Sequence, residues 1–208
     1  MRTIRVTGAF ALMVFLGGCG QLGLPSADAA AVPDAAQQVQ PFVRPAYDLR
    51  AVEVQVPETL RVSEANAYYP LADIVWRGEE RGDRHAQVRA IFEEAAKPAL
   101  AERTDGRPVI AGIEVQRFHA LTEKARYTVG GVHSIRFLLT VRDAESGAIL
   151  EEPRQVIGDL RAAGGGTAIE EDAMGLTQKV LITRHLAEVI GAELEPTPPQ
   201  QAVEEAGP

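Results

Sequence analysis

The only cysteine in this chain of 208 residues is Cys19, and it directly follows a short apolar N-terminal segment. Residues 1–5 carry Arg2 and Arg5 and no acid, and residues 6–16 are almost entirely apolar. About eleven apolar residues fall well short of the roughly twenty that a membrane-spanning helix needs, so the segment is typical of a cleaved export signal. If Cys19 marks the cleavage site, the folded part contains no other thiol. It must then fold without an internal disulfide, a cysteine nucleophile or a thiolate metal site.

A leucine and two small residues, Leu16, Gly17 and Gly18, stand immediately before Cys19. This arrangement resembles the bacterial lipobox, although glycine is a less usual choice at position 17. The resemblance implies a signal peptide over residues 1–18 and a diacylglyceryl anchor, with palmitate among its acyl chains, on Cys19. The alternative is an ordinary secretory signal that is cut at a small-residue site.

The lipobox resemblance also predicts the subcellular location of the mature chain. Gly20 stands where lipoproteins retained in the inner membrane often carry Asp. We therefore expect a lipid-anchored protein of the cell envelope, at the outer membrane and facing the periplasm. The formal net charge is −8, and loss of Arg2 and Arg5 with the signal would make it more negative. Such a charge argues against nucleic-acid partners and against electrostatic docking on anionic lipids, so membrane attachment rests on the lipid alone.

Composition divides the remainder of the chain into three parts. Residues 19–41 are rich in Ala, Gln and Pro after the lipidated cysteine, which predicts a flexible tether. Residues 194–208 combine Pro with Gln and Glu, which predicts a disordered tail. Residues 42–193 lie between them and are long enough to form a single domain with its own core.

Apolar periodicity predicts the secondary structure of this domain. Alternation predicts strands near residues 52–56, 109–115 and 135–141, followed by a hairpin at Gly147. A return strand through Pro153 is expected at a sheet edge or at a bulge. The first helix is expected to begin at Asp83 and to end or kink at Pro98.

A second helix is expected near the C-terminus of the domain. Thr167 and Glu170 have the spacing of a capping box, and the apolar stripe that follows predicts one continuous helix to Gly191. The element order predicts an α+β fold, with a small, mainly antiparallel sheet and two helices packed on one face.

The sequence contains no convincing catalytic, metal or cofactor motif. The histidines lack the spacing of a metal pair, and the serines lack a nucleophile-elbow motif. The glycines at residues 164–166 precede acidic residues that would repel a phosphate. We therefore expect a protein that is not an enzyme and that has no cofactor and no metal.

Aromatic residues gather in one segment. Tyr68, Tyr69 and Trp76 lie in or just after a loop, where exposed aromatic side chains often contact a partner. The alternative is that all three cover one end of the core.

The same region resembles a known family. Residues 62–77 (VSEANAYYPLADIVWR) and 82–88 (GDRHAQV) resemble a family of bacterial lipoproteins of unknown function. The architecture has a more distant likeness to auxiliary lipoproteins of envelope transport systems. The resemblance implies a non-enzymatic accessory or interaction module with an envelope protein as partner. A lipid-anchored binding protein for a small envelope-derived ligand is the alternative, and a hydrolase would require His85, His119 or His133 to converge with an acid and a nucleophile.

Overall fold

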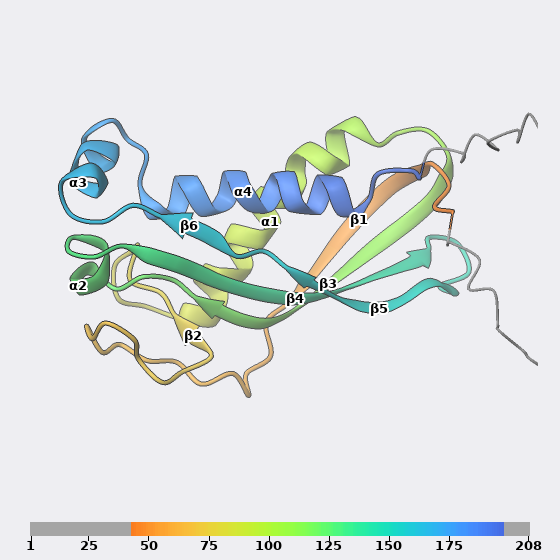
Figure 1. Cartoon of the computed structure of the whole chain (residues 1–208). Coiled ribbons are helices and arrows are strands. Elements are labelled where there is room, and N and C mark those ends of the chain that lie inside the picture. Colours follow the sequence, from red (N-terminus) through yellow and green to blue (C-terminus); the bar gives the residue numbers. More distant parts are fainter. Residues whose placement is uncertain (1–42, 198–208) are drawn as a thin grey trace, which may run out of the picture. The chain divides into compact units, whose positions relative to one another are not determined.

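The structure is a computed structural model and describes residues 43–197 (Figure 1). Its elements are β1 (Tyr47–Gln55), β2 (Ile74–Val75), α1 (Arg84–Glu102), β3 (Arg107–His119), α2 (Glu123–Arg126), β4 (Gly131–Asp143), β5 (Ile149–Ile157), β6 (Leu160–Ala162), α3 (Gly166–Ala173) and α4 (Gln178–Glu193). One open sheet has the strand order β1-β3-β4-β5, with β2 beside β3 and β6 beside β4. The mixed composition of helices and strands was predicted from the sequence.

The sheet is mixed, and the prediction of a mainly antiparallel sheet needs correction. β3 pairs antiparallel with β4, and β4 pairs antiparallel with β5 and β6. β1 and β2 both run parallel to β3. The physical reason is α1, which carries the chain back to the starting end of β1, so that the next strand must run in the same direction.

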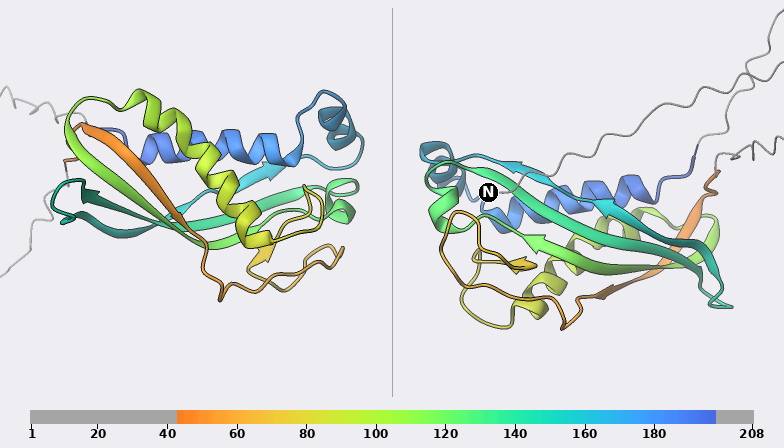
Figure 2. Two further views of the ribbon diagram at one scale, coloured as in Figure 1. Left: turned by 180° about the vertical axis from the view of Figure 1, so that it is seen from behind. Right: turned by 60° about the horizontal axis from the view of Figure 1, so that its bottom comes forward.

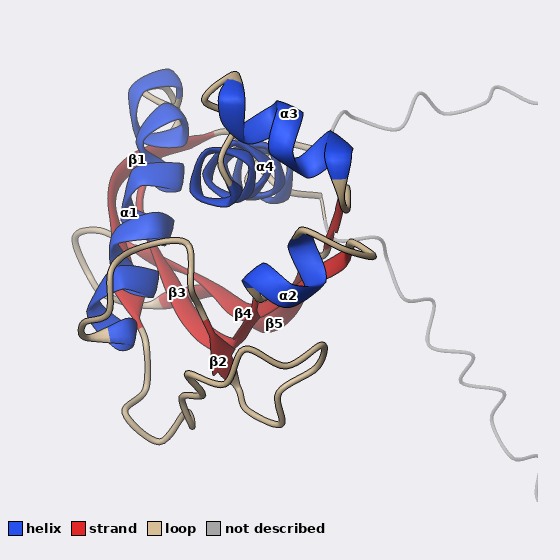
Figure 3. Ribbon diagram, turned by 90° about the vertical axis from the view of Figure 1, so that its left-hand side faces the viewer, coloured by secondary structure: helices blue, strands red, loops and turns tan. Residues whose placement is uncertain are grey.

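The core lies between the sheet and the two long helices. Alternate residues of β3 and β4 point into the core over residues 109–115 and 135–141, and they bury Val109, Ala111, Ile113 and Val115 together with Ile135, Phe137, Leu139 and Val141. α1 adds Val88, Ile91 and Phe92, and α4 adds Ile182, Leu186 and Ile190 to the same cluster. Figure 3 shows α1 and α4 on one side of the strands, where they also contact each other. Each buried side chain of this size contributes roughly 1.5–3 kcal/mol, so this cluster is the main source of stability.

The start of α1 follows the prediction, and of the two alternatives predicted for Pro98, the end of the helix is not observed there. The Asp83 carboxylate accepts the backbone N–H of Ala86 at 3.0 Å, as expected for an N-cap. Pro98 lies inside α1, which continues to Glu102. Because the Pro98 ring lies on the exposed side, the chain loses one backbone hydrogen bond but keeps the buried contacts of Ala95 and Ala99.

The expected single C-terminal helix is two helices. α3 ends at Ala173, and Gly175 follows it with a left-handed φ of 78°. The Thr177 hydroxyl then caps α4, because it accepts the Val180 N–H at 3.4 Å. Gly165 is the N-cap of α3, so Thr167 lies inside the helix and does not form the predicted capping box. The predicted capping box is therefore wrong, and the side-chain cap in this region is that of Thr177 on α4.

The hairpin prediction is confirmed. Gly147 has φ 72°, which is the left-handed conformation that its turn requires. Pro153 lies in β5, which is the last strand of the main order and therefore an edge. The register between β4 and β5 shifts near Val141, which accommodates a strand that passes through proline.

The two chain ends of the described part lie together at one end of the sheet (Figures 1 and 2). The Arg44 N–H donates to the Thr197 hydroxyl, and the Thr197 N–H donates to the Arg44 carbonyl. Leu194 is also buried, so packing extends beyond the expected domain limit at residue 193. β4 begins at the opposite end and runs towards the chain ends over 13 residues, which corresponds to about 40 Å of strand. α2, α3 and the loop over residues 57–73 form the opposite end.

Candidate interaction surface

The residues predicted as sites fall into three groups. Cys19 and the cleavage motif Leu16, Gly17 and Gly18 lie outside the described residues, so their roles stay predictions. Tyr68 and Tyr69 are exposed, with 52% and 64% of their surface accessible. Trp76 is fully buried.

Trp76 cannot contact a partner from its position in the core, which corrects the prediction for this residue. Its ring packs edge-on against Phe118, with ring centroids 5.6 Å apart. Its indole N–H donates to Glu79 at 2.8 Å, so the polar atom of the ring is satisfied. Trp76 is therefore a core residue, and only Tyr68 and Tyr69 of the three predicted aromatic residues are exposed.

The loop that carries these tyrosines is fixed by β3. The His119 imidazole N–H (Nε2) donates to the Pro70 carbonyl at 2.8 Å, and the ring stacks on Tyr69 at 4.5 Å between centroids. Burial lowers the pKa of His119, so the ring is neutral at pH 7. Arg117 donates to the Tyr69 hydroxyl at 2.8 Å. These contacts hold Tyr69 in place although most of its surface is exposed.

α2 fixes the same loop from the other side. The Thr122 hydroxyl donates to the Ala67 carbonyl at 2.7 Å, and the Lys124 N–H donates to the Asn66 side chain at 2.8 Å. The Lys124 ammonium lies 4.6 Å from the centroid of the Tyr68 ring, which is cation–π geometry. The loop is therefore a preformed surface held by contacts that are distant in sequence.

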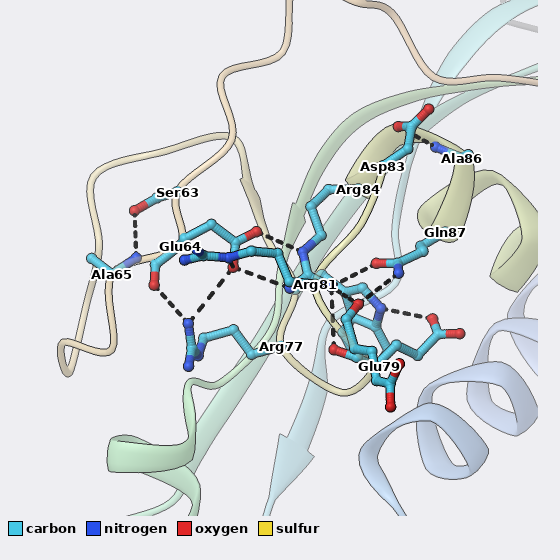
Figure 4. A network of polar contacts seen from close by, with 12 residues as sticks. Ser63, Glu64, Ala65, Arg77, Glu79, Arg81, Asp83, Arg84, Ala86 and Gln87 are labelled. Atoms are coloured by element: carbon cyan, nitrogen blue, oxygen red, sulfur yellow. Dashed lines mark hydrogen bonds and ion pairs between the residues drawn. The ribbon is translucent and has the colours of Figure 1, made fainter.

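An ionic network at the base of the loop connects it to α1 (Figure 4). Arg84 is 4% exposed and binds both carboxylate oxygens of Glu64, at 2.7 and 3.0 Å. Hydrogen bonding from Arg84 holds the pKa of Glu64 below its usual value, with smaller contributions from Arg81 and Arg77. Arg77 also donates to the Glu64 carbonyl at 2.6 Å. The network joins the loop, residues 77–81 and the first turn of α1 into one unit.

α3 is attached to the same end through Arg126. This side chain is 1% exposed, and its guanidinium pairs with Asp172 at 2.8 Å and with Glu171 at 3.4 Å. Tyr127 donates from its hydroxyl to Asp172 at 2.9 Å. Figure 3 looks onto this end and shows α2 and α3 beside the loops.

Two histidines of the described domain, His119 and His133, are buried. His133 is fully buried, its Nδ1 atom accepts the Leu121 N–H at 3.1 Å, and its Nε2 atom has no partner within residues 43–197. Over the same residues, no three His, Cys, Asp or Glu side chains are placed to hold a metal ion. None of the helices described is long and apolar enough to cross a membrane.

A shallow hollow lies on the sheet face that carries no helix. It encloses about 540 Å³ and is lined by residues of all four main strands. Its members include Glu53, Gln55, Gly112, Glu114, Thr140 and Arg142. An ion pair between Arg142 and Glu53 crosses it, so its surface is partly neutralised.

The sequence of the chain matches a known family. Residues 47–207 match a family of unknown function, DUF6778. The chain belongs to this family. The resemblance expected from residues 62–77 is therefore confirmed at the level of a family without an assigned activity. No curated protein matches the sequence.

Solved structures with a similar course of the chain are distant. A protein of Xanthomonas campestris in the family DUF330 is 12% identical, with 74% of this chain and 88% of that chain covered and a TM-score of 0.44. An uncharacterised protein is also 12% identical, covers 74% and 97% of the two chains, and has a TM-score of 0.38. A candidate lipoprotein from Caulobacter crescentus CB15 is 17% identical, covers 69% and 86%, and has a TM-score of 0.31.

Sequence reasoning missed the residues that support the surface. Glu64 and Arg84 lie in the stretches that carry the family resemblance, but nothing in the sequence pairs them, and the partners of Arg117 and His119 lie up to 49 positions away. Only the exposed tyrosines carried a compositional signal, because aromatic residues are otherwise rare in this chain.

Proposed function

We infer that this protein is a lipid-anchored, periplasm-facing lipoprotein that acts as a non-enzymatic accessory or interaction module of an envelope assembly or transport complex. Residues 16–19 support the anchor by their resemblance to a lipobox. The observation that carries the interaction role is the preformed loop surface with exposed Tyr68, Tyr69 and Leu71, of which Leu71 is 86% exposed. Exposed aromatic side chains on a rigid support are typical anchors of protein interfaces.

The anchor is tested by labelling cells with radioactive palmitate. The wild-type chain should incorporate label and fractionate with the outer membrane, whereas Cys19→Ala should give an unlabelled, uncleaved precursor. A Cys19→Ala chain that still carries label would refute lipidation at this residue. Ser26→Ala, which also lies in the segment before the domain, is the control and should label as wild type.

The interaction role is tested by purifying the lipidated chain from cells after mild cross-linking. The wild type should retain a defined set of envelope proteins, and Tyr68→Ser with Tyr69→Ser should lose it. The control is Ile149→Ser with Ile157→Ser, because these exposed residues of β5 are outside the loop surface. A partner set that is unchanged by the loop variant, or no stable partner for the wild type, would count against the proposal.

A second candidate is a lipid-anchored binding protein for a small envelope-derived ligand. The hollow of about 540 Å³ on the helix-free sheet face favours it. A thermal-shift screen with envelope lipids, glycans and peptides tests this alternative. A ligand that raises the melting temperature of the wild type, but not of Gly112→Leu, would support it, and the absence of any shift would remove it.

A further inference from the structure

The loop surface is bordered by two cations that have no acidic partner in the described part of the chain. We call Tyr68, Tyr69, Leu71, Arg117 and Lys124 the aromatic–cationic patch. Arg117 lies 6.0 Å from the Tyr69 ring centroid, and Lys124 lies 4.6 Å from the Tyr68 ring centroid. Each cation therefore lies beside an exposed aromatic ring.

These cations differ from most others in the molecule. The majority of the Arg and Lys side chains within residues 43–197 form ion pairs with Asp or Glu, even though many of them are exposed. Arg117 instead binds the Ala72 carbonyl and the Tyr69 hydroxyl, and neither group is charged. Asp73 is paired with Arg61, whose backbone N–H is the main cause that lowers the pKa of Asp73, and the charge of Arg117 is the smallest of the causes that lower it. In a chain with net charge −8, the patch is a local site of uncompensated positive charge.

The patch is also preorganised. His119 and Thr122 fix the backbone at Pro70 and Ala67, so the exposed rings sit on a supported loop. A surface held in this way loses little conformational entropy on binding, which favours affinity from a small number of side chains. Its apolar rings can bury a partner's side chain, and the flanking cations can pair with carboxylates around it.

We propose that the aromatic–cationic patch binds a protein segment in which an aromatic or aliphatic side chain is flanked by Asp or Glu. This inference rests on the interaction role proposed above and specifies the chemistry of the partner. Charge complementarity is the deciding argument, because Arg117 and Lys124 are the charged groups left without an acid beside the exposed rings.

An anionic bilayer is the less favoured occupant. The net charge of −8 repels a surface of negative lipids at long range. The patch also lies at the end of the sheet opposite the first described residues, about 40 Å away along β4. A short acidic segment of a protein approaches the patch alone and avoids most of this repulsion.

The experiment is a selection of random dodecapeptides, displayed on phage, against residues 20–208, which lack the signal and the lipidated Cys19. We expect enrichment of sequences in which Trp, Phe or Leu has Asp or Glu within three positions. The best peptide is then synthesised and its affinity measured by fluorescence anisotropy. Lys124→Glu and Tyr69→Ser should each weaken binding about tenfold, because each removes one of the few central contacts. Raising NaCl from 50 to 300 mM should weaken wild-type binding several-fold.

Arg184→Glu is the matched control. Arg184 is an exposed arginine on α4 that forms no ion pair with any described residue, so its reversal changes the net charge as Lys124→Glu does. Its affinity should stay within twofold of the wild type, and circular dichroism should show that all three variants fold.

Three outcomes would overturn the inference. Enrichment of neutral or basic peptides at the patch would refute the acidic partner while leaving the interaction role intact. Enriched peptides whose affinity is unchanged by both Lys124→Glu and Tyr69→Ser would show that they bind elsewhere on the chain. Flotation of the same chain with phosphatidylglycerol vesicles, lost in Lys124→Glu and with no peptide enriched, would assign the patch to a membrane surface.

Discussion

Protonation of His133 should destabilise the fold at mildly acidic pH. The ring is fully buried at the start of β4, and its Nδ1 atom accepts the Leu121 N–H, so the neutral ring carries its proton on Nε2. A second proton would have to bind Nδ1, where it would face the Leu121 N–H. Burial is the largest cause that lowers the pKa of His133 to about 4, and the charges of Arg126 and His185 add to it.

The sign of the effect follows from this lowered pKa. The unfolded chain binds the proton with a pKa near 6.5, and the folded chain resists it down to about 4. The contribution of His133 is therefore complete above pH 6.5 and is lost as the pH falls from 6.5 towards 4. Between pH 7.5 and 5.0 the unfolded chain binds more protons at this histidine than the folded chain does. Summed over the interval, this difference lowers the unfolding free energy by about 2 kcal/mol.

The assay is urea unfolding of the mature chain at pH 7.5 and at pH 5.0. With a slope of roughly 2 kcal/mol per molar urea, His133 should account for about 1 M of the fall in the midpoint. His133→Asn is the test variant, because its side-chain oxygen can accept the Leu121 N–H in place of Nδ1 but does not titrate. Its fall in stability over this pH interval should be smaller than that of the wild type by about 2 kcal/mol.

A nearby core variant separates this effect from general destabilisation. Ile135→Val lies on the same strand and should cost about 1 kcal/mol at both pH values. If His133→Asn and Ile135→Val show the same pH dependence as the wild type, then His133 does not resist protonation and the reasoning is refuted.

Three other predictions concern the fold. Thr177→Ala should lower the unfolding free energy by about 1 kcal/mol because it removes the cap of α4, whereas Thr167→Ala should change it by less than 0.5 kcal/mol; equal losses in urea unfolding would contradict the observed start of α4. Glu64→Gln should cost about 2 kcal/mol because it removes the charge that pairs with buried Arg84, while Glu94→Gln, in an exposed pair with Lys97, should cost less than 0.5 kcal/mol; similar midpoints for the two variants would show that the network contributes little. Pro98→Ala should raise the melting temperature, with a gain of about 1–2 kcal/mol, because it restores a backbone hydrogen bond on the exposed side of α1; a lower melting temperature would indicate that proline is required there.

The elements with strong local patterns were predicted from the sequence. Residues 109–115 and 135–141 alternate without interruption, and the structure has β3 and β4 there. Asp83 and Gly147 were predicted correctly because a helix cap and a left-handed turn depend on one residue and its close neighbours.

The features that were missed depend on contacts between distant residues. The parallel pairing of β1 with β3 requires α1 to cross over the sheet, and a list of strands and helices does not by itself give strand direction. Trp76 looked like a loop aromatic because nothing near it in the sequence reveals Phe118 as its neighbour in the core. The apolar stripe continues from α3 to α4, but Gly175 has a positive φ between them and interrupts the helix.

The surface was predicted only in part for the same reason. Tyr68 and Tyr69 were recognised by composition. Arg117 and Lys124 could not be recognised in this way, because only the fold brings β3 and α2 to the loop that carries the tyrosines. An unpaired cation is a property of the assembled structure, since it is defined by the absence of nearby acids in the described domain.

The central claim is that the lipid-anchored chain contacts a partner through the tyrosine loop. The most direct measurement is photo-cross-linking in living cells, with a benzophenone amino acid in place of Tyr69 in the chain that retains Cys19. The account predicts one discrete adduct from position 69, which disappears with Lys124→Glu, and no such adduct from the same probe at position 184. An adduct of equal yield from both positions, or none from position 69, would contradict it.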